Sequence, residues 1–247
     1  MKSALSTKAL SRSFGALKAV NEISIDIPEG KIWAVIGSNG AGKSTLLDLI
    51  TNRTRPTSGH VFYSGEDITG LPTHKIVRKG IGKCFQVSKL FGKLSVYENV
   101  QIACICNAKR HLRFFADADG CLDDQVQEIL RTISLEDKAQ EIAGFLSYGD
   151  QRKLEIGVTL ALNPKLLMLD EPTAGISRTE GYDLMALILK IVKERGITVV
   201  FIEHDMDIVF DFAERITVMH RGEHLFTGTP EEVRNNPKVI STYLGEM

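Results

Sequence analysis

Short apolar runs alternate with longer stretches of helical spacing through most of this 247-residue chain. Residues 31–36, 166–169, 198–202 and 216–219 are each short, almost wholly apolar and bounded by polar or turn-forming residues. Strands that are buried on both faces have this character, and helical stretches separate the last three runs. The pattern predicts an α/β fold with a mainly parallel sheet and helices on both of its faces.

The N-terminal part carries a different pattern. Residues 21–27 alternate between polar and apolar side chains, as a half-buried strand does. Residues 59–65 form a second strand-like stretch between turn signals at Pro56 and Gly65. We therefore expect a β-rich layer around the strand at residues 31–36 and the helix that follows it.

The middle of the chain, from about residue 95 to residue 144, is predicted to be helical. Residues 96–103 and 122–133 show helical spacing, and strand signals are almost absent between them. Residues 107–120 are polar and irregular, which indicates a variable or mobile segment. The predicted architecture is a helical segment inserted into an α/β core.

Composition removes several classes of function. The formal net charge of −1 gives no reason to expect nucleic acid as a partner. No apolar run approaches the ~18 residues that a membrane span needs, and the N-terminus has no signal-peptide core, so membrane association has to come through a partner. The four cysteines lack the C-x-x-C spacing of zinc or redox sites, which favours reduced cytosolic thiols. They are Cys84, Cys104, Cys106 and Cys121.

Residues 37–44 read Gly-Ser-Asn-Gly-Ala-Gly-Lys-Ser, between a predicted buried strand and a predicted helix. The glycines allow backbone N–H groups to turn inward, and the helix N-terminus adds positive potential. Lys43 is expected to reach the β- and γ-phosphates of a nucleotide, and the Ser44 hydroxyl to ligate Mg²⁺. A glycine-rich turn with an accidental lysine is the alternative, which the strand–loop–helix context disfavours. The predicted nucleotide-binding residues of the loop are Gly37, Asn39, Gly40, Ala41, Gly42, Lys43, Ser44 and Thr45.

Two carboxylates, Asp170 and Glu171, follow the apolar run at residues 166–169. Ligands bind at the carboxyl ends of strands in open α/β sheets. Asp170 is expected to hold Mg²⁺, and Glu171 to orient or deprotonate the water that attacks the γ-phosphate. Alone, the pair could equally be a solvated acidic pair after a strand.

His204 and Gln86 are weaker candidates. His204 follows the run at residues 198–202 and could donate a hydrogen bond to a γ-phosphate oxygen, although a lone histidine is usually structural or solvated. Gln86 follows the apolar residues 81–85, and most glutamines in such positions are merely exposed.

Residues 146–152 form a polar, glycine-containing turn that is predicted to lead into a helix starting near Gln151. A helix N-terminus preceded by serine and glycine can be an anion site. By itself, Ser147 is better explained as a simple N-cap.

The order of these elements resembles the ATP-binding-cassette (ABC) ATPases over nearly the whole chain. The phosphate loop is followed by Gln86 as the Q-loop, residues 146–151 as the signature, residues 168–171 as Walker B and His204 as the switch histidine. The resemblance implies a P-loop NTPase core, an N-terminal antiparallel β layer and an inserted helical subdomain.

The resemblance also implies one ABC ATPase domain over residues 1–247. Residues 1–94 and 153–247 would form the RecA-like core with the β subdomain, and about residues 95–152 the helical subdomain. Gln86 would act in catalysis and as a Mg²⁺ ligand. Phe14 would stack on adenine, with a core phenylalanine as the alternative.

Ser147 and Gly149 would contact the ATP of a second ATPase subunit, identical or paralogous, in a head-to-tail dimer. Membrane permease subunits and, indirectly, an external substrate-binding protein would be the other partners, with the chain peripheral on the cytoplasmic face of the inner membrane. Three positions depart from the general pattern: Tyr148, Asp150 and Ser177. Ser177 stands where many ABC ATPases have aspartate, which leaves its own cross-subunit contact open.

Within the ABC ATPases the chain is most similar to the ATPases of branched-chain amino-acid importers. This likeness lies in residues 78–86, 94–100, 202–206 and 228–246. Importers of urea or short amides share several of these strings, and lipopolysaccharide-type ATPases share two shorter ones. A soluble cassette protein outside transport is a third possibility. The transported substrate is not encoded in these motifs.

Overall fold

The computed structural model describes residues 2–84, 90–108 and 119–242, with side chains of the last range described from residue 122. The strands of the described chain are β1 (Ser3–Phe14), β2 (Leu17–Ile23), β3 (Asp26–Pro28), β4 (Ile32–Ile36), β5 (Ser58–Tyr63), β6 (Glu66–Asp67), β7 (Ile81–Cys84), β8 (Leu166–Asp170), β9 (Thr198–Ile202), β10 (Arg215–His220) and β11 (Glu223–Gly228). The helices are α1 (Lys43–Ile50), α2 (Thr73–Arg78), α3 (Val96–Asn107), α4 (Asp119–Thr132), α5 (Tyr148–Leu160), α6 (Arg178–Arg195), α7 (Met206–Phe212), α8 (Pro230–Arg234) and α9 (Pro237–Thr242). Short 3₁₀ turns lie at Glu136–Lys138 and Ala143–Phe145.

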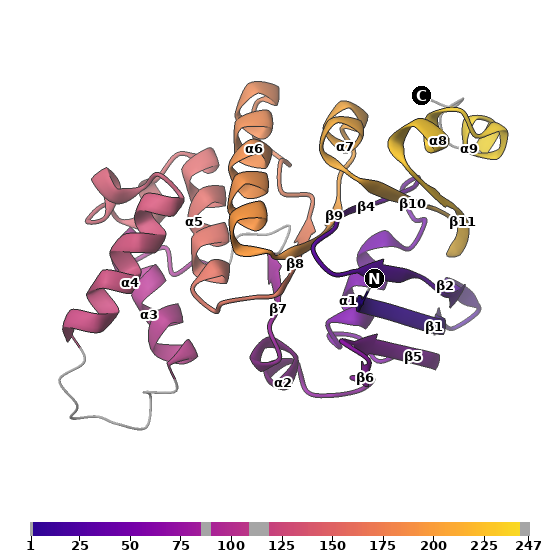
Figure 1. Cartoon of the computed structure of the whole chain (residues 1–247), viewed down its shortest axis with the longest axis horizontal. Helices are drawn as coiled ribbons and strands as arrows, with labels where there is room; N and C mark the ends of the chain where they lie inside the picture. The colour runs from indigo at the N-terminus through magenta and orange to yellow at the C-terminus, as the bar shows by residue number, and fades with distance from the viewer. Residues whose placement is uncertain (1, 85–89, 109–118, 243–247) are drawn as a thin grey trace.

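A six-stranded sheet in the order β11-β10-β4-β9-β8-β7 forms the centre of the molecule (Figure 1). All neighbouring pairs from β10 to β7 are parallel, and β11 adds an antiparallel edge. Side chains alternate between two cores: Trp33 and Val35 of β4 enter one, whereas Ala34 and Ile36 enter the other. The predicted parallel sheet, buried on both faces, is confirmed.

The N-terminal antiparallel layer is also confirmed. Its sheet has the order β2-β1-β5-β6, and β3 pairs with the start of β1. Helix α1 lies between the two sheets, because its buried leucines belong to the same core as residues of β1, β5 and β8.

The single strand predicted over residues 21–27 is wrong, because the chain breaks it into β2 and β3. Ile23 pairs with Leu10, whereas Ile27 pairs with Leu5, so the two halves meet different parts of β1. At the break, Thr7 Oγ1 donates to the Ile23 carbonyl at 2.8 Å and accepts from Ile25 N–H at 3.2 Å. A side chain of the neighbouring strand thus takes the place of a ladder hydrogen bond.

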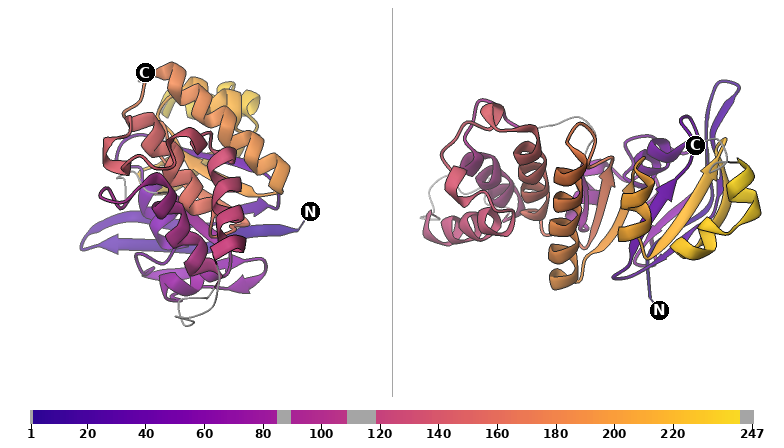
Figure 2. Two further views of the ribbon diagram at one scale, coloured as in Figure 1. Left: turned by 90° about the vertical axis from the view of Figure 1, so that its left-hand side faces the viewer. Right: turned by 90° about the horizontal axis from the view of Figure 1, so that it is seen from above.

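Helices α3, α4 and α5 form a separate group beside α6 at the β7 side of the central sheet (Figures 1 and 2). Helix α3 begins at a capping box, in which Ser95 and Glu98 exchange side chain-to-backbone hydrogen bonds. The helices predicted over residues 96–103 and 122–133 are therefore present. Residues 109–118 lie outside the described residues, so the predicted mobility of that segment stays a prediction. So do the predicted subdomain boundaries, of which the one at residue 152 falls within α5.

Phe201, the fourth residue of β9, is fully buried. We expect Phe201→Ala to lower the free energy of unfolding by about 3–5 kcal/mol, because it leaves a cavity between the sheet and its helices. Phe145→Ala is the matched control, since Phe145 is 87% exposed and its loss should change stability by less than about 0.5 kcal/mol. Urea unfolding of both variants checks this, and equal effects would contradict the described core.

Candidate nucleotide-binding site

The turn between β4 and α1 brings three backbone segments close together. A Cβ atom at Gly37 would lie 2.2 Å from the carbonyl oxygen of Met219, and one at Gly42 would lie 2.1 Å from that of Ala19. Gly42 also has φ at +96°, where side chains other than hydrogen are strained. Glycine is therefore required at both positions, and the loop can wrap its backbone inward.

Lys43 opens α1, and its ammonium group is held inside this loop. Its Nζ donates to the carbonyl oxygens of Gly37 at 2.7 Å and Ser38 at 3.2 Å. Burial lowers the pKa of Lys43, and the nearby carboxylates of Glu171 and Asp170 partly oppose that shift. The lysine is a confined cation at the point where an anionic ligand would enter.

The parallel register brings the strand ends to one edge. Ile202 at the end of β9 pairs with Asp170 on one side and Val35 on the other. Ser44 Oγ donates to Asp170 Oδ1 at 3.2 Å, which joins α1 to the end of β8. A hollow of about 250 Å³ lies at this edge. It is lined by Asn39, Gly40, Ala41, Gly42, Lys43, Ser44, Thr45, Glu171 and His204.

Glu171 and His204 lie side by side in the lining of the hollow. Glu171 Oε1 and His204 Nε2 are 2.8 Å apart, at hydrogen-bond distance. Glu171 has φ at +53°, a left-handed conformation that is uncommon for residues with a side chain. Its N–H donates to the Ile202 carbonyl at 3.0 Å, which fixes this turn against β9. Backbone strain of this kind is concentrated at functional sites, and here it aims the carboxylate at the imidazole.

Glu203 contributes to the site, although the sequence motifs assign it no role. It is 3% exposed. Its Oε1 accepts from the N–H of Thr173 at 2.8 Å and from the Thr173 hydroxyl at 2.7 Å, and its Oε2 accepts from the N–H of His204 at 3.1 Å. Glu203 thus clamps the loop after β8 to the loop after β9. A charged residue directly after an almost wholly apolar strand is the sequence signal for such a clamp.

The helix that carries the signature begins earlier than predicted. Helix α5 starts at Tyr148 and not near Gln151, because Ser147 Oγ accepts from Asp150 N–H at 3.2 Å and caps the helix. Gly149 lies in its first turn. Neither Ser147 nor Gly149 lines the phosphate-loop hollow of the same chain.

One of the departures from the general ABC pattern, Tyr148, packs against Gly175 in the loop after β8. A Cβ atom at Gly175 would lie 2.8 Å from Tyr148 Cε1, so the tyrosine ring rests on the glycine. The Tyr148 hydroxyl also accepts from Arg152 at 2.8 Å. The signature turn and the loop after β8 therefore touch within one chain.

The other two departures, Asp150 and Ser177, both have polar partners within the chain. The Asp150 carboxylate accepts from Lys138 at 2.5 Å and from Lys153 at 3.3 Å. Burial raises its pKa, but these hydrogen bonds outweigh burial and the net shift is downward. Ser177 caps α6 in a capping box with Glu180.

Phe14 is not among the residues that line the hollow. Phe14 ends β1, is 49% exposed and packs beneath the Arg12 guanidinium, 4.5 Å from the ring centre. It is therefore not a core residue. Gln86 lies outside the described residues.

The geometry defines a P-loop nucleotide-binding protein, and comparison with known proteins gives its family. The ABC transporter family model matches residues 20–174, and the model for "Branched-chain amino acid ATP-binding cassette transporter" matches residues 223–247. The chain belongs to the ABC transporter ATPases. Within them it belongs to the ATP-binding proteins of the branched-chain amino acid transporter family.

Curated relatives align over almost the entire chain. The chain is 40% identical to the high-affinity branched-chain amino acid transport ATP-binding protein BraF of Pseudomonas aeruginosa and 38% identical to LivG of Escherichia coli K12. Each alignment covers 98% of both proteins. Membership implies ATP binding, and ABC ATPases dimerise and pair with permease subunits.

Solved structures agree on the fold. The ADP conformation of MJ1267, an ATP-binding cassette of an ABC transporter, superposes with a TM-score of 0.87 at 31% identity and 99% coverage of both chains. A dimeric post-hydrolysis structure of the ATP-binding cassette MJ0796 bound to ADP and Pi superposes with a TM-score of 0.78 at 27% identity, over 92% of this chain and 98% of that one. In the part of the chain that the structure describes, no helix is both long and apolar enough to span a bilayer.

The Glu203 clamp predicts a separation of catalysis from binding. Glu203→Gln replaces an acceptor oxygen by a donor that cannot accept from Thr173 or His204. We expect ATP turnover to fall about tenfold or more, because Glu171 and His204 lose their alignment, whereas ATP affinity stays near the parent value. Turnover and equilibrium nucleotide binding measure both quantities. Glu232→Gln, in the capping box of α8, is the control, and equal losses in the two variants would refute the clamp.

Proposed function

We propose that this chain binds and hydrolyses Mg²⁺-ATP to drive import of branched-chain or other hydrophobic amino acids through a membrane permease. The observation that carries the proposal is the convergence of Lys43, Ser44, Glu171 and His204 around one hollow. Asp170 lies behind Ser44 and accepts a hydrogen bond from its hydroxyl at 3.2 Å. Support for the substrate class comes from BraF and LivG, whose names assign them to branched-chain amino acid transport.

The residues beside the loop fit a magnesium ion bound with ATP. Mg²⁺ prefers hydroxyl, carboxylate and phosphate oxygens and keeps several waters. Ser44 and Asp170 offer such oxygens 3.2 Å apart, and Gln86 is the third proposed ligand. When bound, the ion would offset charge on the β- and γ-phosphates. Lys43 and the loop N–H groups would hold the phosphates.

Glu171 and His204 divide the remaining chemistry. Glu171 would orient or deprotonate the attacking water. Its carboxylate is already within hydrogen-bond distance of His204 at the edge of the hollow, so it is placed to accept a hydrogen bond there. His204 would then turn from Glu171 and donate a hydrogen bond to a γ-phosphate oxygen.

A second ATPase subunit would complete the site. Ser147 and Gly149 stand at the N-terminus of α5, where N–H groups and the helix dipole attract anions, but they are outside the hollow of their own chain. We infer that, in a head-to-tail dimer, Ser147 and Gly149 cover the γ-phosphate of the ATP that the partner subunit binds. Phe14 would stack on the adenine ring. The MJ0796 structure, which is dimeric and bound to ADP and Pi, supports the formation of a dimer.

The permease would dock in a groove between α2 and α5. The groove has a volume of about 230 Å³, is mainly apolar and shares strand β7, which leads to Gln86. Its apolar residues include Ile76, Val77, Val158 and Leu162. Docking here would place the chain on the cytoplasmic face of the membrane and link nucleotide-driven motion to the permease. An external binding protein would supply the substrate, and nucleic acid has no part.

The role of Glu171 gives the first test. We expect Glu171→Gln to lower the ATPase rate about 10²-fold or more while the protein still binds ATP, because only the proton acceptor is lost. ATP should then hold a stable dimer, which light scattering after size-exclusion chromatography detects. Near-normal turnover in this variant would contradict the assignment of Glu171.

The groove gives the second test. Val158→Asp places a charge among apolar groups that the permease would cover, so co-purification with the permease subunits should fall about tenfold or more. ATP binding by the isolated subunit should be unchanged. Leu17→Asp, at an exposed site outside the groove, is the control. Full retention of the permease by the Val158 variant would refute this docking surface.

The substrate class gives the third test. Reconstituted with its permease and binding protein, the wild-type complex should hydrolyse ATP several-fold faster when the binding protein carries leucine, isoleucine or valine. Urea and short amides are the comparison ligands. Stimulation by urea alone would assign the chain to an importer of short amides.

A further inference from the structure

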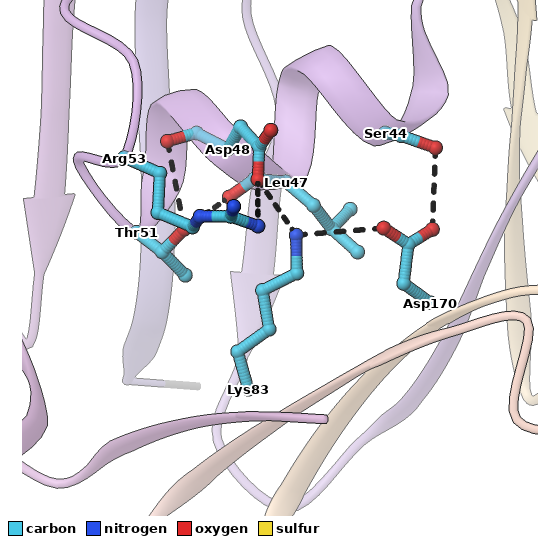
Figure 3. A network of polar contacts seen from close by, with 7 residues as sticks. All are labelled: Ser44, Leu47, Asp48, Thr51, Arg53, Lys83 and Asp170. Atoms are coloured by element: carbon cyan, nitrogen blue, oxygen red, sulfur yellow. Dashed lines mark hydrogen bonds and ion pairs between the residues drawn. The ribbon is translucent and has the colours of Figure 1, made fainter. Parts of the chain in front are cut away.

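Lys83 is a buried cation to which the motifs above assign no role. It lies on β7 and its side chain is only 5% exposed. Figure 3 shows its ammonium group between the end of β8 and helix α1. Burial of a charge is unfavourable unless opposite charges compensate it, so its partners indicate what it does.

Two carboxylates meet the Lys83 ammonium. Nζ lies 2.8 Å from Asp48 Oδ1 on α1 and 3.4 Å from Asp170 Oδ2 at the end of β8 (Figure 3). Asp48 also lies 3.4 Å from Arg53. The shorter contact pairs Lys83 with Asp48, so Asp48 balances most of the charge of Lys83. Asp170 makes the longer, additional contact.

The longer contact matters for the orientation of Asp170. Its Oδ1 accepts from Ser44 and its Oδ2 faces Lys83, so each oxygen has a partner on a different element. The terminal torsion of an aspartate has a broad energy minimum, and contacts at both oxygens are needed to fix the carboxylate plane. Lys83 supplies the second contact, on the side away from Ser44.

We propose that Lys83 is a positioning residue that orients the Asp170 carboxylate for Mg²⁺ and ties it to the strand that leads to Gln86. The proposal rests on the proposed function, because it presumes that Asp170 holds the metal. Lys83, Asp48 and Asp170 come from β7, α1 and β8, so a shift of β7 would turn Asp170. The metal site and the segment beside the permease groove would then be mechanically joined, since Lys83 also lines that groove.

The test compares Lys83→Met, which keeps the length of the stem without the charge, with Lys83→Arg, which keeps the charge. Lys79→Met is the control, because Lys79 forms an ion pair with Glu66 at the surface, outside the metal site. Affinity for a fluorescent ATP analogue is measured in EDTA and across a Mg²⁺ titration. Thermal unfolding monitors the fold, and Lys83→Gln replaces the methionine variant if that one does not fold.

In Lys83→Met we expect the Mg²⁺ concentration for half-maximal tightening of nucleotide binding to rise about tenfold, as the loss of one charge-assisted contact implies. Affinity in EDTA should stay within twofold, and Lys83→Arg should recover most of the Mg²⁺ response. A purely structural lysine would weaken binding in EDTA equally, which would overturn the proposal. An unchanged or tighter Mg²⁺ response would also overturn it. Absence of ATP binding by the wild-type chain would instead refute the proposed function.

Discussion

Burial of the central strands on both faces is the constraint on which the site depends. Every residue of strands β4, β8 and β9 is buried. A shift of one strand against its neighbour would move buried side chains to the wrong face, so the parallel register is fixed. Because Ile202 pairs with both Asp170 and Val35, the loops that follow these strands must start at the same edge. The strand register alone therefore brings together the phosphate loop, the two carboxylates and the switch histidine. No bound nucleotide is needed to make them neighbours.

The charges at this edge are held by a second set of polar contacts. Asp170 is placed between Ser44 and Lys83, and Glu203 binds the backbone of both loops that carry Glu171 and His204. The side chains of Asp170, Lys83 and Glu203 are buried, so each needs its partners and tolerates little displacement. The same arrangement that keeps the carboxylates oriented before nucleotide binds would let a movement of β7 reach the metal site.

The parts of the molecule that could be predicted from sequence are those set by local pattern. Apolar runs located the buried strands, and the loop-and-strand rules located the residues around the hollow. The break between β2 and β3 could not be predicted, because Thr7, far away in sequence, replaces the ladder bond there. The partners of Lys83 and Glu203 were likewise missed, since they come from distant elements. Helix α5 starts earlier than predicted, at the residue that follows the N-cap Ser147.

The central claim is that one chain contributes one half to each of two ATP sites: its phosphate loop to one site and its signature turn to the other. Hydrogen exchange with a slowly hydrolysed ATP analogue tests it directly, since amides in the first turn of a helix lack intrahelical acceptors and exchange readily. The account predicts protection of residues 37–45 at every protein concentration. The amides of Tyr148 and Gly149 should be protected only when dimers form, at high concentration or with the partner ATPase present. Protection of both segments together in the dilute monomer would contradict it.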